Sequence, residues 1–404
     1  MAIELSNIAF TNQADVIPAF GVEDIVNTGS ANTLAGNDEI TGTGTEYNLI
    51  GEPTGDGTGF YNIGTGFYNI GTLNTANGND IITGIHSPTD PYNSIGLDVK
   101  SYGILHEAGT IDTGNGNDII TGISEAIIDD GTAFTGLGIY IGSNSTLDTG
   151  KGNDIITARG RYFGILNYGI VHTDDGNDLI TGTSGEGLSS SVHNLGVINT
   201  GDGNDTITGT PTGTAWIEVG IYNADTIDTG NGNDTIIGIG ARFGIENYGT
   251  INTGNGNDSI IAEAGFEPLF AGYNSIGNKG SINTGNGNDS IISKGRLYNS
   301  GVIFLGEGND SFIADGVFDG SGNVFLGNGE DYIKGFGSGN LNGGNGQDTL
   351  ELTSGSYTVG IWGTTVNFTK DSTIMNTSEF EKLIASTTTY DFSNLTNGQT
   401  IFVA

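Results

Sequence analysis

The chain has 404 residues and no cysteine, and its 47 Asp and Glu against 11 Lys and Arg give a formal net charge of −36. This charge excludes a basic nucleic-acid binder, because phosphate recognition depends on Lys and Arg. The lack of cysteine excludes disulfide scaffolds, thiol enzymes and Cys-ligated zinc sites. No apolar run approaches the roughly 18 residues of a membrane helix, and residues 1–5 lack the character of a signal peptide, so we expect no membrane span.

The composition also indicates a missing partner of positive charge. A chain this acidic, with 72 glycines, repels itself and is normally disordered. Yet 35% of its residues are hydrophobic, which is too much apolar content for an acidic tail. We therefore expect a bound cation to neutralise the folded chain.

Residues 1–32 precede any repeat, and we interpret them as an N-terminal capping segment. From residue 33 to 351 a turn of the form Thr-Gly-x-Gly-Asn-Asp recurs, followed by x-Ile-x-Gly and seen in full in residues 111–122. The acids that close these turns are Asp38, Asp80, Asp118, Asp154, Asp178, Asp205, Asp234, Asp258, Asp289, Asp310, Asp331 and Asp348. They are 17 to 42 residues apart, so each turn belongs to one unit of a repeat protein.

Between the turns, short segments alternate aliphatic and polar residues, as in 164–173 and again in 244–253. This alternation predicts two or three short strands in each unit, whereas glycine interrupts every run that a helix would need. The fold class we expect is all-β, a parallel β-solenoid whose coils stack about 4.8 Å apart. The long early coils predict bulging loops at 43–72 and 85–105, with the duplicated segments 58–64 and 65–71 as a local insertion.

The turns carry the chemistry of a calcium site. Glycines at alternate positions let successive carbonyl oxygens point to one side of the chain, and the closing Asp adds an anionic oxygen. Ca²⁺ takes six to eight such oxygens and suits a carbonyl-rich site better than Mg²⁺ does. The glycines that we select as ligand positions, with the closing aspartates, are Gly114, Gly116, Gly230, Gly232, Gly254, Gly256, Gly285 and Gly287.

Stacked turns would share ions, so twelve turns leave at most about eleven gaps for Ca²⁺. The turns at 33–38 and 75–80 each lack a glycine, which leaves their binding open. The alternative is a metal-free ladder of Asn and Asp turns. We disfavour it because carboxylates stacked about 5 Å apart repel each other strongly without cations.

The pattern resembles the haemolysin-type calcium-binding (RTX) repeat, Gly-Gly-x-Gly-x-Asp-x-aliphatic-x, which residues 343–351 match in full and most turns match with Thr in the first place. The resemblance implies main-chain carbonyl and Asp ligands and a β-roll that forms only with calcium. That family carries two motifs in each coil, whereas this chain carries one. We therefore expect a single column of ions along one edge, with the opposite turns closed by Asn and Gly alone.

The repeats stop before residues 352–404, which we interpret as a C-terminal cap, since a solenoid needs its last coil covered. This tail also resembles the C-terminal signal of RTX proteins exported by type I secretion. The resemblance implies a protein that is secreted or held at the cell surface and that folds on meeting extracellular calcium.

Catalytic motifs are missing from the sequence, so we expect no enzyme. The four histidines, His86, His106, His172 and His193, have no His-Glu-x-x-His spacing, and there is no Gly-x-Ser-x-Gly elbow or phosphate loop. An enzyme acting on polysaccharide stays an alternative, because β-solenoids can carry such chemistry on acids outside the repeat turns. Those acids include Asp129, Asp130, Glu218, Glu246 and Glu263.

The leading interpretation is a calcium-dependent structural or cell-surface protein, with itself or a cell-surface polysaccharide as possible partner. A further alternative is ice binding, as in RTX-type antifreeze modules, which display a flat array of Thr and Asn from their turns. Here the third position of the turn varies among residues such as Asn115, Lys151 and Asp175, which breaks that array.

Overall fold

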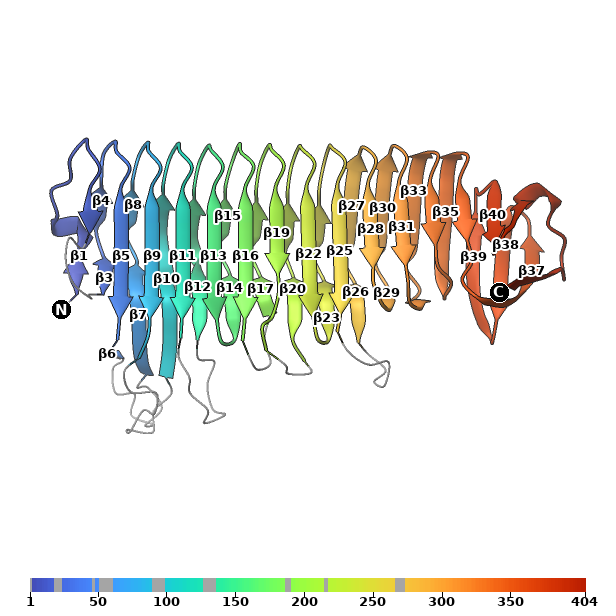
Figure 1. The fold of residues 1–404 in the computed structure, drawn as a ribbon, viewed down its shortest axis with the longest axis horizontal. Helices are drawn as coiled ribbons and strands as arrows, with labels where there is room; N and C mark the ends of the chain where they lie inside the picture. Colours follow the sequence, from blue (N-terminus) through green and yellow to red (C-terminus); the bar gives the residue numbers. More distant parts are fainter. Residues whose placement is uncertain are drawn as a thin grey trace. The chain divides into compact units, whose positions relative to one another are not determined.

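The computed structural model describes residues 2–17, 24–45, 48–50, 61–88, 99–125, 136–185, 190–213, 217–265 and 273–404. Apart from two short 3₁₀ segments, η1 (Leu5–Asn7) and η2 (Phe392–Asn394), the regular structure of these residues is β (Figure 1). The fold is a parallel β-solenoid, which confirms the expected class. The chain divides into two compact units, Met1–Tyr222 and Asn223–Ala404.

Each coil of the first unit contributes one strand to a front sheet, which faces the viewer in Figure 1, and one or two strands to a rear sheet. The front strands are β2 (Val16–Ile17), β5 (Glu39–Gly44), β9 (Ile81–His86), β11 (Ile119–Ser124), β13 (Ile155–Gly160), β16 (Leu179–Ser184) and β19 (Thr206–Gly209). The rear strands are β1 (Ile3–Glu4), β3 (Ile25–Asn27), β4 (Ser30–Asn32), β6 (Asn48–Ile50), β7 (Tyr61–Asn69), β8 (Thr72–Asn74), β10 (Val99–Asp112), β12 (Leu137–Asp148), β14 (Phe163–Asn167), β15 (Ile170–His172), β17 (Ser190–Asn194) and β18 (Val197–Asn199), with β20 (Val219–Asn223) at the unit boundary.

The second unit also has a front and a rear sheet, and it ends in antiparallel strands. Its front strands are β22 (Thr235–Gly240), β25 (Ser259–Ala264), β28 (Ser290–Ser293), β31 (Ser311–Ala314), β34 (Tyr332–Lys334), β36 (Thr349–Glu351), β40 (Lys382–Ala385) and β41 (Thr388–Asp391). Its rear strands are β21 (Thr226–Asp228), β23 (Phe243–Asn247), β24 (Thr250–Asn252), β26 (Asn274–Asn278), β27 (Ser281–Asn286), β29 (Leu297–Asn299), β30 (Val302–Glu307), β32 (Phe318–Asp319), β33 (Asn323–Gly329), β35 (Gly339–Gly346), β37 (Gly355–Trp362), β38 (Thr365–Lys370), β39 (Thr373–Ser378) and β42 (Thr400–Val403).

Strand alternation places the core between the two sheets. In the front strands the second residue points inward, so Ile82, Ile120 and Ile156 stack in register and are almost fully buried. Each such isoleucine contributes roughly 2 kcal/mol of burial energy. The residues on either side of it point outward, which leaves a polar and aliphatic outer face on the front sheet.

A ladder of buried asparagines runs through the rear sheet. In the second unit the Asn247 side-chain amide donates to Asn278 Oδ1 over 2.8 Å, and Asn278 donates to Asn299 over 2.9 Å. In the first unit, His106 replaces an asparagine: its Nδ1 lies 3.0 Å from the Asn69 amide and its Nε2 lies 2.9 Å from the Thr146 carbonyl. These hydrogen bonds satisfy polar groups that would otherwise be buried in the core without a partner.

The prediction of bulging loops at 43–72 and 85–105 is partly wrong. β7 and β10 run through these segments and pair in parallel over seven residues. The second duplicated copy, residues 65–71, is therefore part of a coil and no insertion, since Phe67 is fully buried in line with Ile104. The physical reason is that its Gly-Phe-Tyr-Asn alternates in the same way as the strand at 164–167. Residues 58–60 of the first copy lie outside the described part of the chain.

Beyond residue 354 the pairing changes from parallel to antiparallel. β37 pairs with β38 and β42, and β38 pairs with β39, while β39 and β40 still pair in parallel with the last coil. Tyr357, Phe368 and Met375 fill the inner side of these strands. The described residues contain no helix with the length and hydropathy of a membrane span.

Candidate metal centre

The predicted aspartates form one column in each unit. All twelve directly precede a front strand and are at most 2% exposed. In both units the Oδ1 atom of every column Asp after the first accepts the main-chain N–H of the corresponding Asp one coil earlier, at 2.7 to 3.0 Å. The first column runs from Asp38 to Asp205 and the second from Asp234 to Asp348.

The second carboxylate oxygen has no such donor. The Oδ2 atoms of ten of these residues are buried and without a hydrogen-bond partner among the described atoms: Asp38, Asp80, Asp118, Asp154, Asp178, Asp258, Asp289, Asp310, Asp331 and Asp348. The Thr113 hydroxyl lies near the Asp118 carboxylate, but its hydrogen bond goes to the Thr149 carbonyl at 3.2 Å. A buried anionic oxygen left unpaired is costly, and its recurrence at these ten positions indicates a set of ligand oxygens for a cation.

Burial also raises the pKa of these carboxylates. It raises the pKa of Asp118, Asp178, Asp289 and Asp348 to about 6, and that of Asp154, Asp205 and Asp310 to about 7. The main-chain N–H donors lower the pKa and neighbouring acids raise it further, but burial is the largest cause. The carboxylates are therefore held in surroundings that disfavour their charge in the metal-free protein.

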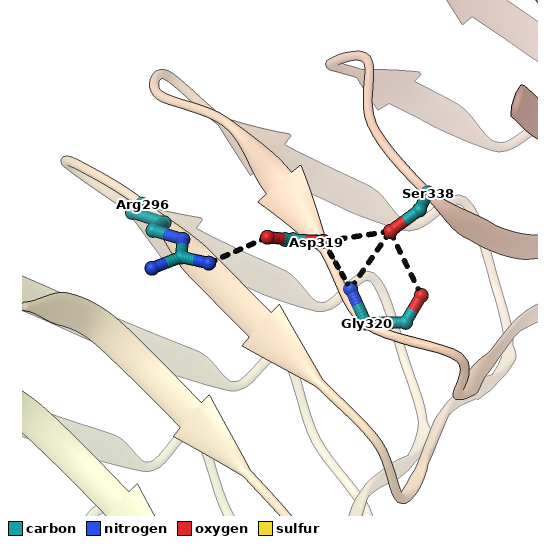
Figure 2. A network of polar contacts seen from close by, with 4 residues as sticks. All are labelled: Arg296, Asp319, Gly320 and Ser338. Atoms are coloured by element: carbon teal, nitrogen blue, oxygen red, sulfur yellow. Dashed lines mark hydrogen bonds and ion pairs between the residues drawn. The ribbon is translucent and has the colours of Figure 1, made fainter. Parts of the chain in front are cut away.

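Contrasting behaviour is seen at Asp319, where both carboxylate oxygens have donors. Figure 2 shows Asp319 between Arg296, whose Nη2 lies 2.5 Å from one oxygen, and the Ser338 hydroxyl, 2.7 Å from the other. Burial would raise the pKa of Asp319, but the hydrogen bonds from Ser338, Arg296 and the Gly320 N–H lower it. The expectation that only Asn and Gly close the connections away from the Asp turns is therefore wrong in these coils.

Stacking explains the turn glycines. A Cβ on Gly116 would lie 1.3 Å from the Gly78 carbonyl oxygen, and one on Gly152 would lie 1.3 Å from that of Gly116. The same crowding holds at Gly256 and Gly287. Carbonyl oxygens of one turn thus lie directly against the next turn, so each gap is bordered by main-chain oxygens as well as by the carboxylate.

The second position of the turn has left-handed backbone. Its φ is +83° at Gly114, with similar values at Gly230, Gly254 and Gly285, while Gly232 has a φ of +145° at the fourth position. Leu34 and Ala76 adopt the same conformation, with φ of +68° and +66°, although it is unfavourable for them. The two irregular turns therefore keep the backbone shape of the others, and whether they bind an ion stays a prediction.

Two further hydrogen-bond ladders in the turns were not predicted from the sequence. The fifth-position side chain accepts the N–H of its counterpart one coil later, as Asn79 accepts from Asn117 at 2.8 Å and Asn117 from Asn153 at 2.8 Å. The first-position threonine donates to the next threonine carbonyl, as Thr75 does to Thr113 at 3.3 Å. The sequence carried a signal for both ladders, because the first-position Thr and the fifth-position Asn recur in most turns. Only the strand register shows which groups they form hydrogen bonds with.

The donor set fits a hard divalent cation. Among the described residues no three His, Asp or Glu side chains lie close enough to form a metal site by themselves. An ion between two turns would therefore take carboxylate oxygens from the aspartates and its remaining ligands from main-chain carbonyls. Carboxylate and carbonyl oxygens are the ligands that Ca²⁺ prefers.

The histidines lie apart and have structural contacts. His86 Nδ1 lies 2.6 Å from the Ser101 hydroxyl, His106 belongs to the asparagine ladder, and His193 stacks on Tyr222 with ring centroids 4.3 Å apart. His172 pairs in register with Asn199 on the rear sheet.

The three predicted acids outside the turns that the structure describes, Glu218, Glu246 and Glu263, do not form a shared metal site. Glu246 on the rear sheet lies 3.3 Å from Lys279, and Glu263 on the front sheet lies 3.3 Å from Lys294. Glu218 is buried near Gly213. Asp129 and Asp130 lie outside the described residues.

Comparison with known proteins adds little to this geometry. No protein-family model matches the chain, and no curated protein sequence matches it. One similar solved structure is described as a hyperactive, Ca²⁺-dependent, β-helical antifreeze protein from an Antarctic bacterium. It is 19% identical over 96% of each chain, with a TM-score of 0.47, and supports no inference about the ligand or activity of this chain.

Proposed function

We propose that the chain is a calcium-binding structural protein, secreted or held at the cell surface, that folds on binding extracellular Ca²⁺. The observation that carries this proposal is the buried carboxylate oxygen without a partner, repeated in coil after coil. In each gap the Asp Oδ2 atom and the turn carbonyls would hold the ion, and the threonine and asparagine ladders would keep the turns in register.

The charge supports the same proposal. About eleven ions would change the formal charge from −36 to about −14, because each adds two positive charges. With affinities near 10⁻³ to 10⁻⁴ M, millimolar calcium supplies on the order of 1 kcal/mol at each site. Summed over all the sites, this is comparable to the stability of a whole domain, so metal binding and folding would be coupled.

The test is circular dichroism of the purified full chain with and without EGTA. We expect the β signal to be largely lost in EGTA, to return with millimolar Ca²⁺, and to return far less with Mg²⁺. Asp258→Asn removes one column carboxylate and should raise the calcium midpoint, whereas Asp315→Asn removes an exposed acid outside the column and should not. Full β structure in chelator would reject coupled folding.

Secretion and partners belong to the same proposal. The cytosolic calcium concentration lies below the dissociation constants of such sites, so the chain would stay unfolded until export. The tail at 352–404 would act as cap and export signal. Outside the cell, its partner would be another copy or a surface polysaccharide. We propose no catalytic activity.

Ice binding is a second candidate, favoured by the outer face of the front sheet. In the first unit six threonines stand in register over six successive coils: Thr41, Thr83, Thr121, Thr157, Thr181 and Thr208. The aliphatic residues Ile81, Ile119, Ile155 and Leu179 run beside them. The regular array therefore lies on this sheet and not on the variable turns.

Thermal hysteresis of the calcium-loaded protein tests this candidate. An ice binder would lower the freezing point below the melting point, and Thr121→Tyr, which disrupts the array, would reduce the gap. Thr250→Tyr on the rear sheet is the matched control. Absence of hysteresis in the wild-type protein would remove the candidate.

A further inference from the structure

The carboxylate column of the second unit does not end at the last turn. The main-chain N–H of Asp348 donates to Oε2 of Glu381 over 2.8 Å, just as the N–H of Asp331 donates to Asp348. Glu381 directly precedes β40, whose first residue, Lys382, pairs in parallel with Thr349. Glu381 therefore occupies the place that the next aspartate of the column would have.

Asp348 is the last aspartate of the repeat turns before this glutamate. Asp348 is fully buried, and its Oδ2 atom has no hydrogen-bond partner among the described residues. Glu381 comes from the C-terminal segment and from no repeat, so the last turn is followed by a carboxylate that the turn motif does not supply.

The backbone around this gap is shaped to leave space for an oxygen cluster. Nine of the twelve turns begin with Thr, but the last begins with Gly343. A Cβ at this position would lie 1.9 Å from the carbonyl oxygen of Glu379 and 2.9 Å from Asp348 Oδ2. Only glycine leaves these two oxygens facing the same space. The Glu379 carboxylate itself is engaged elsewhere, with Asn342 at 2.8 Å.

We propose that Asp348, Glu381 and the carbonyl oxygen of Glu379 form a terminal calcium site between the last turn and the C-terminal segment. This inference rests on the proposed calcium function and adds one site to the gaps between the turns. Its consequence is specific: an ion here joins β40 to the last coil, so calcium orders the C-terminal strands as well as the repeats.

The decisive variant is Glu381→Gln in the full chain, with Glu330→Gln as control. The glutamine amide oxygen can still accept the Asp348 N–H, so a purely structural role survives the substitution, whereas an anionic ligand is lost. Glu330 is an exposed acid in the preceding turn. Its replacement by glutamine removes one negative charge from the turns, as Glu381→Gln does at the last coil. The readouts are bound Ca²⁺ per chain by equilibrium dialysis and hydrogen exchange of the β40 amides.

We expect Glu381→Gln to bind one calcium fewer than wild type and to lose at least tenfold protection in β40, with the repeats still protected. Glu330→Gln should match wild type in both. Unchanged stoichiometry and protection in Glu381→Gln would overturn the terminal site and leave Glu381 as an N–H acceptor only. Failure of the wild-type chain to bind calcium would instead overturn the proposed function.

Discussion

At the scale of single residues, the second position of the turn shows what the stacked architecture demands. The backbone there is left-handed whichever residue occupies it, because the turn above and the turn below fix its shape. Leu34 and Ala76 adopt a conformation that costs a residue with a Cβ roughly 1–2 kcal/mol. The coils around them must supply that energy.

Replacing Ala76 by glycine should therefore stabilise the calcium-loaded protein by about 1 kcal/mol, since glycine enters this conformation without strain. The measurement is the urea midpoint followed by circular dichroism in millimolar Ca²⁺. Ala35→Gly is the matched control: Ala35 is exposed in the first turn and has no positive φ, so its replacement should leave the midpoint unchanged or lower it slightly. Equal effects of the two substitutions would contradict the strain at Ala76.

At the scale of structural elements, stability comes from ladders in which the same side chain bonds its counterpart in the next coil. The buried asparagine ladder shows this best. Asn247 donates to Asn278 and to the Ser281 carbonyl at 2.9 Å. Its Oδ1 also accepts from Asn223 at 2.9 Å. Truncating such a residue leaves several buried polar groups unpaired.

Asn247→Ala should lower the free energy of unfolding by about 2–4 kcal/mol, because each unsatisfied buried group costs about 1–3 kcal/mol. Asn255→Ala tests the same amino acid in an exposed ladder of the turns, where water replaces the lost partner and the loss should stay below about 0.5 kcal/mol. Denaturant unfolding of both variants in calcium gives the comparison. Similar losses would show that the buried position adds nothing.

The sequence predicted the solenoid and the positions of the twelve Asp turns, because glycine and Asp recur at fixed places and alternation sets the strands. It could not show that Asn117 bonds Asn153, or that Thr121 stacks on Thr157, because those contacts depend on which strands become neighbours. Glu381 was missed for a related reason: it lies outside the repeat, is one methylene longer than the residue it replaces, and is recognised only by its register with Asp348.

At the scale of the whole molecule, the dominant quantity is negative charge held out of water. Ten column carboxylates have a buried oxygen without a partner, and burial raises the pKa of seven of the column aspartates to about 6 or 7. In an unfolded chain an Asp pKa is about 3.9. At pH values between the unfolded-state pKa and these raised pKa values, the metal-free folded state binds more protons than the unfolded state.

Without calcium, stability should therefore fall as pH rises from about 4 to 7, since the unfolded state binds fewer protons over this window. The buried histidines oppose this trend, because burial lowers the pKa of His106 and lowers that of His193 to about 4, but they are fewer than the acids. In buffer freed of metals by a chelating resin, we expect more β structure at pH 5.0 than at pH 7.5. The difference should persist in 0.5 M NaCl, which screens surface repulsion but not burial.

Calcium should reverse this dependence of stability on pH. Protons and Ca²⁺ compete for the same carboxylates, so in millimolar Ca²⁺ the thermal midpoint should be higher at pH 7.5 than at pH 5.0. Both measurements use circular dichroism of the same preparation. A metal-free protein that gains β structure as pH rises from 5.0 to 7.5 would show that the column carboxylates are stabilised without a cation, and the calcium proposal would lose its physical basis.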